Sequence, residues 1–109
     1  MIALEERLAE LLLQYDEVLA VLDERVQTRI PLQSPSALET IQRLRKLRAE
    51  LGSQPEEGET RQEQIWRGGI ELQSLTEKLE DCAGKTFPRR ATDLYGISEE
   101  LARLGKGEA

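Results

Sequence analysis

The first thirty residues carry apolar side chains at alternating spacings of four and three, which is the period of one face of a helix. This stripe consists of Leu4, Leu8, Leu11, Tyr15, Val18 and Leu22. Beside it, Leu12, Leu19 and Val26 repeat every seven residues and widen the apolar face to about three positions in seven. The pattern predicts a helix over residues 2–28 with a face wide enough to contact two neighbouring helices of a bundle.

A second helix is predicted over residues 35–51, with signals at both of its ends. Pro35 suits a first helical turn, and Ser36 with Glu39 matches a capping box. Gly52 follows the last apolar position as a C-cap. The apolar positions of this segment are Leu38, Ile41, Leu44, Leu47 and Leu51. Their spacing predicts another helix with one buried face.

The third predicted helix covers residues 60–83 and contains an irregularity. Thr60 with Glu63 matches a capping box at its start. Its apolar stripe is Ile65, Leu72, Leu75, Leu79 and Cys82. Gly68 occupies the position that would continue this stripe, and Gly69 follows it. Each glycine inside a helix costs about 1 kcal/mol relative to alanine, so some other interaction must offset the pair.

The remaining residues, 85–109, contain a basic connector and a fourth, shorter apolar stripe. That stripe is Leu94, Ile97, Leu101 and Leu104. An isolated helix of this length is marginal in water, so it must dock on its own bundle, on a second copy or on a partner. The predicted fold is all-α: an antiparallel three-helix bundle over residues 1–84, followed by the connector and a short C-terminal amphipathic helix.

The chain lacks most of the side chains that usually carry out catalysis. The chain of 109 residues has no histidine, a single cysteine and no glycine-rich phosphate loop. Cys82 lies on an apolar stripe and is interpreted as a small core residue. The sequence therefore predicts a protein that is not an enzyme, with no catalytic, cofactor-binding or metal-binding residues and no cofactor. A cytoplasmic location is expected, because one cysteine cannot form an internal disulfide.

The net charge of −6 favours a basic protein partner and disfavours both membrane surfaces and nucleic acid. The strongest basic tract is Arg43, Arg45, Lys46 and Arg48. At 100° per residue these cations spread around both sides of the apolar stripe, whereas a groove-reading helix would collect them on one face. We interpret them as a solvated flank that pairs with acidic residues of neighbouring helices.

Two segments are candidates for partner binding. Trp66 with Gly68 and Gly69 indicates one of three arrangements: a groove that another helix approaches closely, glycines that relieve crowding against the first helix while Trp66 covers the core, or a kink. The connector, residues 85–90, combines three cations with Phe87. It either holds an acidic partner or forms a turn in which Phe87 covers the end of the bundle.

In general character, the chain resembles the small acidic export chaperones of flagellar and type III secretion systems. It is leucine-rich, opens with a long leucine-periodic helix and ends in an amphipathic segment over residues 93–104. The resemblance implies a protein that binds the amphipathic helix of a secreted subunit and prevents its premature assembly. It transfers no residue roles to this chain.

The leading functional hypothesis is a helical protein-interaction module, an adaptor or export-type chaperone, that binds a partner's amphipathic helix. Its candidate binding residues are Trp66, Gly68, Gly69, Phe87, Leu94, Ile97, Leu101 and Leu104. An alternative is a structural subunit in which the first helix pairs with its copy in an obligate homodimer or larger assembly. A third, remote hypothesis is an assembly subunit that contacts nucleic acid through its arginines.

Overall fold

The structure is a computed structural model that describes residues 3–28 and 30–107. Within these two ranges every regular element is helical and there is no strand, which confirms the all-α class. The α-helices are α1 (Leu4–Val26), α2 (Pro35–Leu51), α3 (Arg61–Ala83) and α4 (Asp93–Gly105). Short 3-10 helices η1 (Ile30–Gln33), η2 (Gly84–Thr86) and η3 (Arg89–Thr92) connect them.

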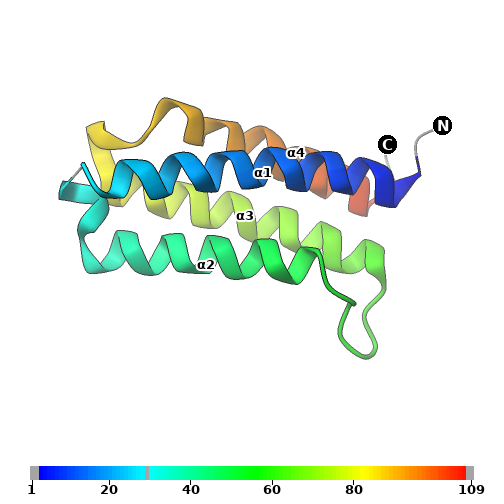
Figure 1. Cartoon of the computed structure of the whole chain (residues 1–109). Helices are drawn as coiled ribbons and strands as arrows, with labels where there is room; N and C mark the ends of the chain where they lie inside the picture. Colours follow the sequence, from blue (N-terminus) through cyan, green and yellow to red (C-terminus); the bar gives the residue numbers. More distant parts are fainter. Residues whose placement is uncertain (1–2, 29, 108–109) are drawn as a thin grey trace.

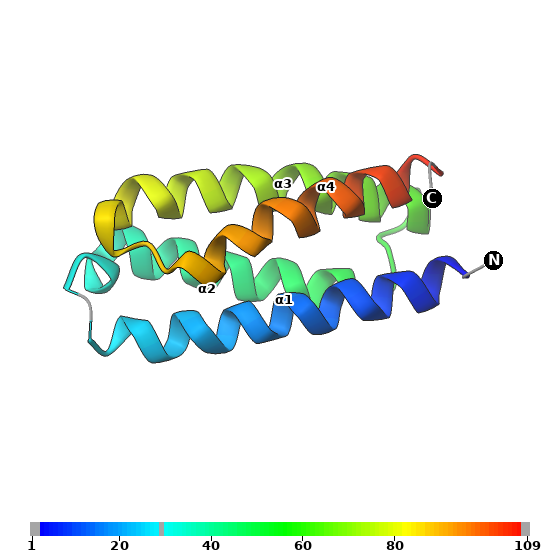
Figure 2. The same ribbon diagram turned by 90° about the horizontal axis from the view of Figure 1, so that it is seen from above.

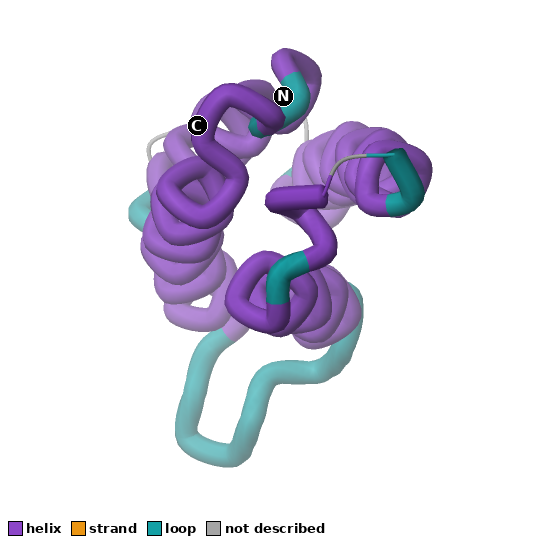
Figure 3. Tube along the Cα trace, turned by 90° about the vertical axis from the view of Figure 1, so that its left-hand side faces the viewer, coloured by secondary structure: helices purple, strands orange, loops and turns teal. Residues whose placement is uncertain are grey.

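The α-helices lie side by side, and each runs opposite to the one before it (Figures 1 and 2). α1 packs against α2, α2 against α3 and α3 against α4, and α4 returns to contact α1. Seen along the bundle, they surround a common centre (Figure 3). The structure does not confirm a three-helix bundle with an appended fourth helix, because α4 packs along two other helices.

Local capping explains the start of α2 and corrects one prediction. The N-cap is Ser34, whose hydroxyl accepts a hydrogen bond from the Ala37 N–H at 3.2 Å. Ser34 precedes Pro35, and a residue before proline favours the extended backbone that an N-cap needs. The predicted capping box of Ser36 and Glu39 is therefore wrong, since Ser36 lies inside the first turn.

The Thr60 half of the capping box predicted for the third helix is confirmed. The Thr60 hydroxyl accepts from the Glu63 N–H at 3.0 Å, and α3 begins at the next residue. At the other end Gly84 has φ of 55°, a left-handed conformation that favours glycine, and the helix stops there as predicted.

α1 is shorter than predicted at its C-terminus. It ends at Val26, where the Thr28 N–H bonds to the Arg25 carbonyl at 3.0 Å in a closing turn. The Gln33 side chain reaches back and donates to the Val26 carbonyl at 2.7 Å. These bonds satisfy carbonyls that a helix end leaves without partners. Ile2, the predicted start of the helix, lies outside the described residues.

The core is aliphatic and receives side chains from all four α-helices. Its largest fully buried members are Leu8, Leu11, Tyr15, Leu22, Leu32, Ile41, Leu44, Leu51, Ile65, Leu72, Leu79 and Leu94. From the second row of α1, Leu12 is buried, and Leu19 and Val26 are half-buried against the core. Leu38 was predicted to belong to the buried face of the second helix, but it is exposed. It lies on the same side of α2 as the exposed Arg45, seven residues later.

Tyr15 of α1 links this helix to α2 through its buried hydroxyl group. The side chain is fully buried, and its hydroxyl donates to the Leu44 carbonyl of α2 at 2.5 Å. Burial raises the pKa of Tyr15 far above its ordinary value, so the phenol stays neutral. This hydrogen bond joins a side chain of α1 to the backbone of α2, so it favours one position of α1 against α2.

Replacing Tyr15 with phenylalanine should lower the free energy of unfolding by about 1 kcal/mol, the net value of one buried hydrogen bond. Tyr95→Phe is the matched control, because the Tyr95 hydroxyl donates to Glu80 at 2.7 Å on the surface. We expect the control to cost less than about 0.5 kcal/mol. Urea unfolding of both variants measures the difference, and equal losses would show that the buried bond has no special role.

Candidate interaction surfaces

The apolar stripe of α4 faces the interior of the bundle. Leu94 and Leu101 have no exposed surface, and Ile97 and Leu104 are also buried. α4 therefore docks on its own chain, which is one of the destinations that the sequence left open. In this conformation these side chains offer no surface to a partner, which would reach them only if α4 left the bundle.

Glycines allow α4 to lie unusually close to α3. A Cβ placed on Gly69 would be 2.7 Å from the Ala102 nitrogen and 2.8 Å from the Ser98 oxygen, both backbone atoms of α4. A Cβ on Gly105 would be 2.6 Å from the Cα of Trp66 in α3. Real Cβ atoms are not found at such distances, so the two helices can pack this closely only with glycine at these positions.

Gly68 allows α2, the other neighbour of α3, to approach closely. A Cβ placed there would be 2.5 Å from a methyl group of Leu51 in α2. The adjacent glycines thus let α2 approach on one side and α4 on the other, and this packing offsets their helix penalty. The packing interpretation is confirmed, but the expected crowding against the first helix is wrong.

Trp66 and Ile70 form an exposed apolar pair on the outer side of α3, which we call the Trp66–Ile70 face. Their side chains are 41% and 50% exposed and lie one helical turn apart. Trp66 therefore does not simply cover the core. Ile70 was missed by the sequence analysis because it falls outside the buried stripe, although its spacing from Trp66 places both on one side.

The other exposed large apolar side chains of the described residues stand alone. Leu13 is 63% exposed on α1, and the residues one turn away from it are Ala9, Glu10, Asp16 and Glu17. Single exposed leucines are common on protein surfaces. The Trp66–Ile70 face is thus distinguished by the pairing of two large side chains rather than by exposure alone.

A groove of about 380 Å³ between α3 and α4 lies beside this face. Its lining is mostly polar: Gln73, Tyr95, Ser98, Glu99, Ala102, Arg103 and Lys106. Gln73 comes three residues after Ile70 on α3, so the groove and the Trp66–Ile70 face adjoin. Desolvation and the hydrogen bond to Glu80 raise the pKa of Tyr95, and the one hydroxyl proton of Tyr95 is already donated to Glu80.

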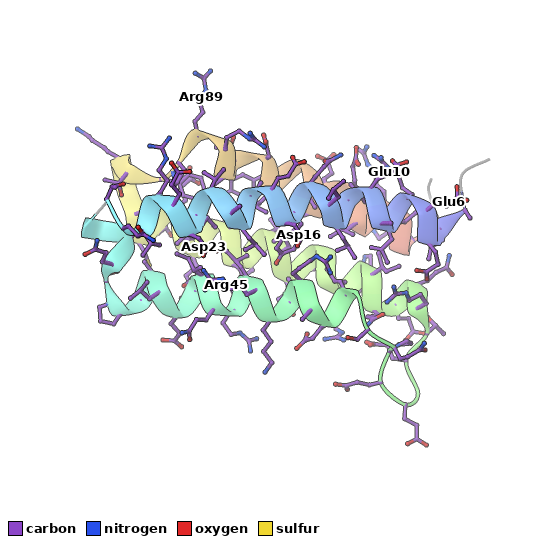
Figure 4. The ribbon with its side chains drawn as sticks, in the orientation of Figure 1. Glu6, Glu10, Asp16, Asp23, Arg45 and Arg89 are labelled. Atoms are coloured by element: carbon purple, nitrogen blue, oxygen red, sulfur yellow. The ribbon has the colours of Figure 1, made fainter. Side chains whose placement is uncertain are left out.

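The arginines of α2 are paired with carboxylates of the adjacent helices. Arg48 makes a two-pronged contact with Asp16 of α1 at 2.8 and 3.0 Å, and Arg45 pairs with Asp23 of the same helix. Figure 4 shows Asp16, Asp23 and Arg45 between the two ribbons. On the other side Arg43 contacts Glu71 of α3 at 3.0 Å. These pairs confirm the predicted solvated flank and leave these arginines less available to phosphates.

A wider hollow lies beside the loop after α2. Its lining includes Arg61, whose guanidinium is already paired. Arg61 donates to the Glu5 carboxylate at 2.9 Å and to the Ser53 carbonyl at 2.9 Å. Its guanidinium holds the pKa of Glu5 below the ordinary value. The buried Gln64 side chain accepts from Arg61 and donates to the Glu50 carbonyl at 2.8 Å. This cluster anchors the loop, and most of the N–H donors of Arg61 are already engaged.

The connector lies at the opposite end of the bundle from that loop (Figure 1). Phe87 is half-buried and packs against the hydrophobic core, as expected for one of the two alternatives, a turn in which Phe87 covers the end of the bundle. Leu32 of η1 is fully buried nearby, and η1 contacts α1, α2 and α3. The aromatic ring is therefore held in place, while the cations around it remain exposed.

The described residues contain no group of three or more histidine, cysteine or acidic side chains placed to hold a metal ion. No helix in the described part of the chain has the length and apolar character needed to cross a membrane. Comparisons with family models, curated proteins and solved structures found no match to this chain. The candidate surfaces therefore depend on the geometry of this chain alone.

Proposed function

We propose that this protein is a non-enzymatic interaction module whose Trp66–Ile70 face binds an amphipathic helix of a partner. The observation that carries the proposal is the exposure of two large apolar side chains one turn apart, in a chain that buries its other helical stripes. Tryptophan is enriched among residues that dominate binding energy at interfaces. An export-type chaperone is the form of this function that the sequence resemblance favours.

The charges on this side of α3 favour a basic partner. Glu63 and Glu77 lie seven residues before and after Ile70, which places them on nearly the same side of the helix. Both are exposed, and neither forms an ion pair within the described structure. Arg67, the nearest cation on α3, is held by Glu59 at 2.9 Å. A helix with leucines on one face and flanking lysines complements this arrangement.

The packing of α4 moves the proposed working surface away from the C-terminal helix. A detachable α4 would have to expose four buried aliphatic side chains and separate a contact matched to Gly69 and Gly105. Binding on the outer side of α3 requires neither change. The paired arginines of α2 likewise support a protein partner over nucleic acid.

Trp66 is the single tryptophan of the chain and reports directly on this face. A synthetic leucine and lysine peptide of about 18 residues, five helical turns, should shift its emission to shorter wavelength in a saturable manner. A peptide with glutamate in place of lysine should have little effect, because it is repelled by Glu63 and Glu77.

Ile70→Ser should weaken binding of the leucine and lysine peptide about fivefold, which corresponds to about 1 kcal/mol for half a buried aliphatic side chain. Leu13→Ser is the matched control, because it makes the same kind of change on an exposed site of α1. It should leave the affinity unchanged. Equal losses in the two variants, or none at Ile70, would contradict the proposal.

A further inference from the structure

A shallow basic depression occupies the end of the bundle where the connector follows α3. Arg25 from the last turn of α1 faces the connector across it. The hollow has a volume of about 240 Å³ and is lined by Arg25, Lys85, Thr86, Phe87, Pro88 and Arg89. We call it the basic depression. No acidic residue contributes to its lining.

The cations of the basic depression differ from the other arginines. Every other arginine in residues 3–28 and 30–107 has a carboxylate within 4.0 Å, including Arg90, which contacts Glu17 and Asp93. Arg25, Lys85 and Arg89 have no such partner within the described residues. The side chain of Arg89 extends away from the ribbon (Figure 4). In a chain of net charge −6, three unpaired cations around one hollow are a local excess that an anion would neutralise.

The remaining lining determines which anions fit. Phe87 is half-buried against the core and contributes apolar surface to the lining, whereas Pro88 is buried. The volume lies below the roughly 300 to 1,000 Å³ of pockets that enclose whole small molecules. It suits one anionic group and a neighbouring apolar side chain. Guanidinium groups match the planar carboxylate with two parallel hydrogen bonds.

We propose that the basic depression binds an acidic peptide segment, with a carboxylate between Arg25, Lys85 and Arg89 and an apolar side chain on Phe87. A long polyanion fits less well, because the negative charge of the rest of the chain repels it. The Trp66–Ile70 face lies in the N-terminal half of α3 (Arg61–Ala83), whereas Lys85 of the basic depression follows the C-terminus of that helix. The two proposals therefore succeed or fail independently.

The test uses the full chain and a fluorescein-labelled hexapeptide of four glutamates and two leucines. Fluorescence anisotropy should show saturable binding that weakens as salt is raised from about 50 to about 300 mM. Arg25→Glu and Arg89→Glu should each weaken it about tenfold or more, because each removes a charge-assisted bond and adds repulsion. Lys46→Glu is the matched control, since it makes the same charge change at an exposed lysine of α2.

Several outcomes would overturn the proposal. One is an equal loss of affinity in the Lys46 variant, which would show attraction to overall charge rather than to this site. Equal binding of a glutamine version of the peptide would also contradict it. Displacement by inorganic phosphate at the peptide's own concentration would identify a site for small oxyanions. Self-association that requires both Arg89 and the exposed Glu56 and Glu57 would assign the site to a second copy.

Discussion

A chain truncated after Thr92 is expected to lose its cooperative unfolding transition and most of its helical circular dichroism. The deletion removes four core side chains, Leu94, Ile97, Leu101 and Leu104, that are at most 5% exposed. Burial of each contributes about 1.5 to 3 kcal/mol, so together they account for about 6 to 12 kcal/mol. That matches the total stability of a typical small domain, about 5 to 15 kcal/mol.

Removal of residues 107–109 is the control, because it shortens the chain but leaves α4 (Asp93–Gly105) complete. That variant should melt near the temperature of the full chain. If the 1–92 chain also unfolded cooperatively, α4 would be a detachable segment rather than part of the core. The C-terminal stripe would then return as a surface for binding a partner.

Gly69→Ala should destabilise the protein by about 1 to 3 kcal/mol, although alanine is the better helix former by about 1 kcal/mol. The added methyl group would meet backbone atoms of Ser98 and Ala102 in α4 at 2.8 and 2.7 Å. Backbone atoms of a packed helix cannot move aside as the tip of a side chain can. α3 and α4 must therefore separate along their length, which opens voids among the buried leucines.

Gly96→Ala provides the matched control within α4, since a Cβ there would meet no atom within 4 Å. Only the better helix propensity of alanine should then count, and it should raise the free energy of unfolding by about 0.5 to 1 kcal/mol. Gly68→Ala should fall between the two, because the group it meets is the flexible end of Leu51. Thermal or urea unfolding of the three variants gives the order directly. A stabilising Gly69→Ala would contradict the close contact of α3 with α4.

The boundaries of α2 and α3 were predictable because their signals are local. Proline at the first position of α2 and glycine after its last leucine fix residues 35–51, which the structure reproduces. Thr60 and Gly84 do the same for α3 within one residue. The one incorrect cap, Ser36, failed because a serine two residues earlier had the better backbone conformation.

The arrangement of the helices was less predictable because it depends on pairing between distant segments. The stripe of α4 showed that it must be buried, but periodicity does not specify which surface buries it. Gly68 and Gly69 signalled a close approach, yet only the fold shows that α2 and α4 are the neighbours.

The candidate surfaces were the hardest part to predict. Ile70 is exposed because it lies outside the stripe of α3 that faces the bundle, which the sequence pattern shows only once its neighbours are known. The lack of a partner for Arg25 follows from which carboxylates reach that end of the bundle, and this is not a property of nearby sequence. By contrast, the role of the α2 arginines could be predicted, since their spread around the helix already excluded a single basic face.

Native-state hydrogen exchange tests most directly whether α4 is a core helix of this bundle. The amides of Ile97 and Leu101 in α4 should exchange with the same free energy of opening as Leu72 in α3, within about 0.5 kcal/mol, because all three lie in one cooperative unit. If the α4 amides opened with a free energy several kcal/mol lower while Leu72 stayed protected, α4 would leave the bundle by itself. That result would contradict the account and favour the C-terminal helix as the working surface.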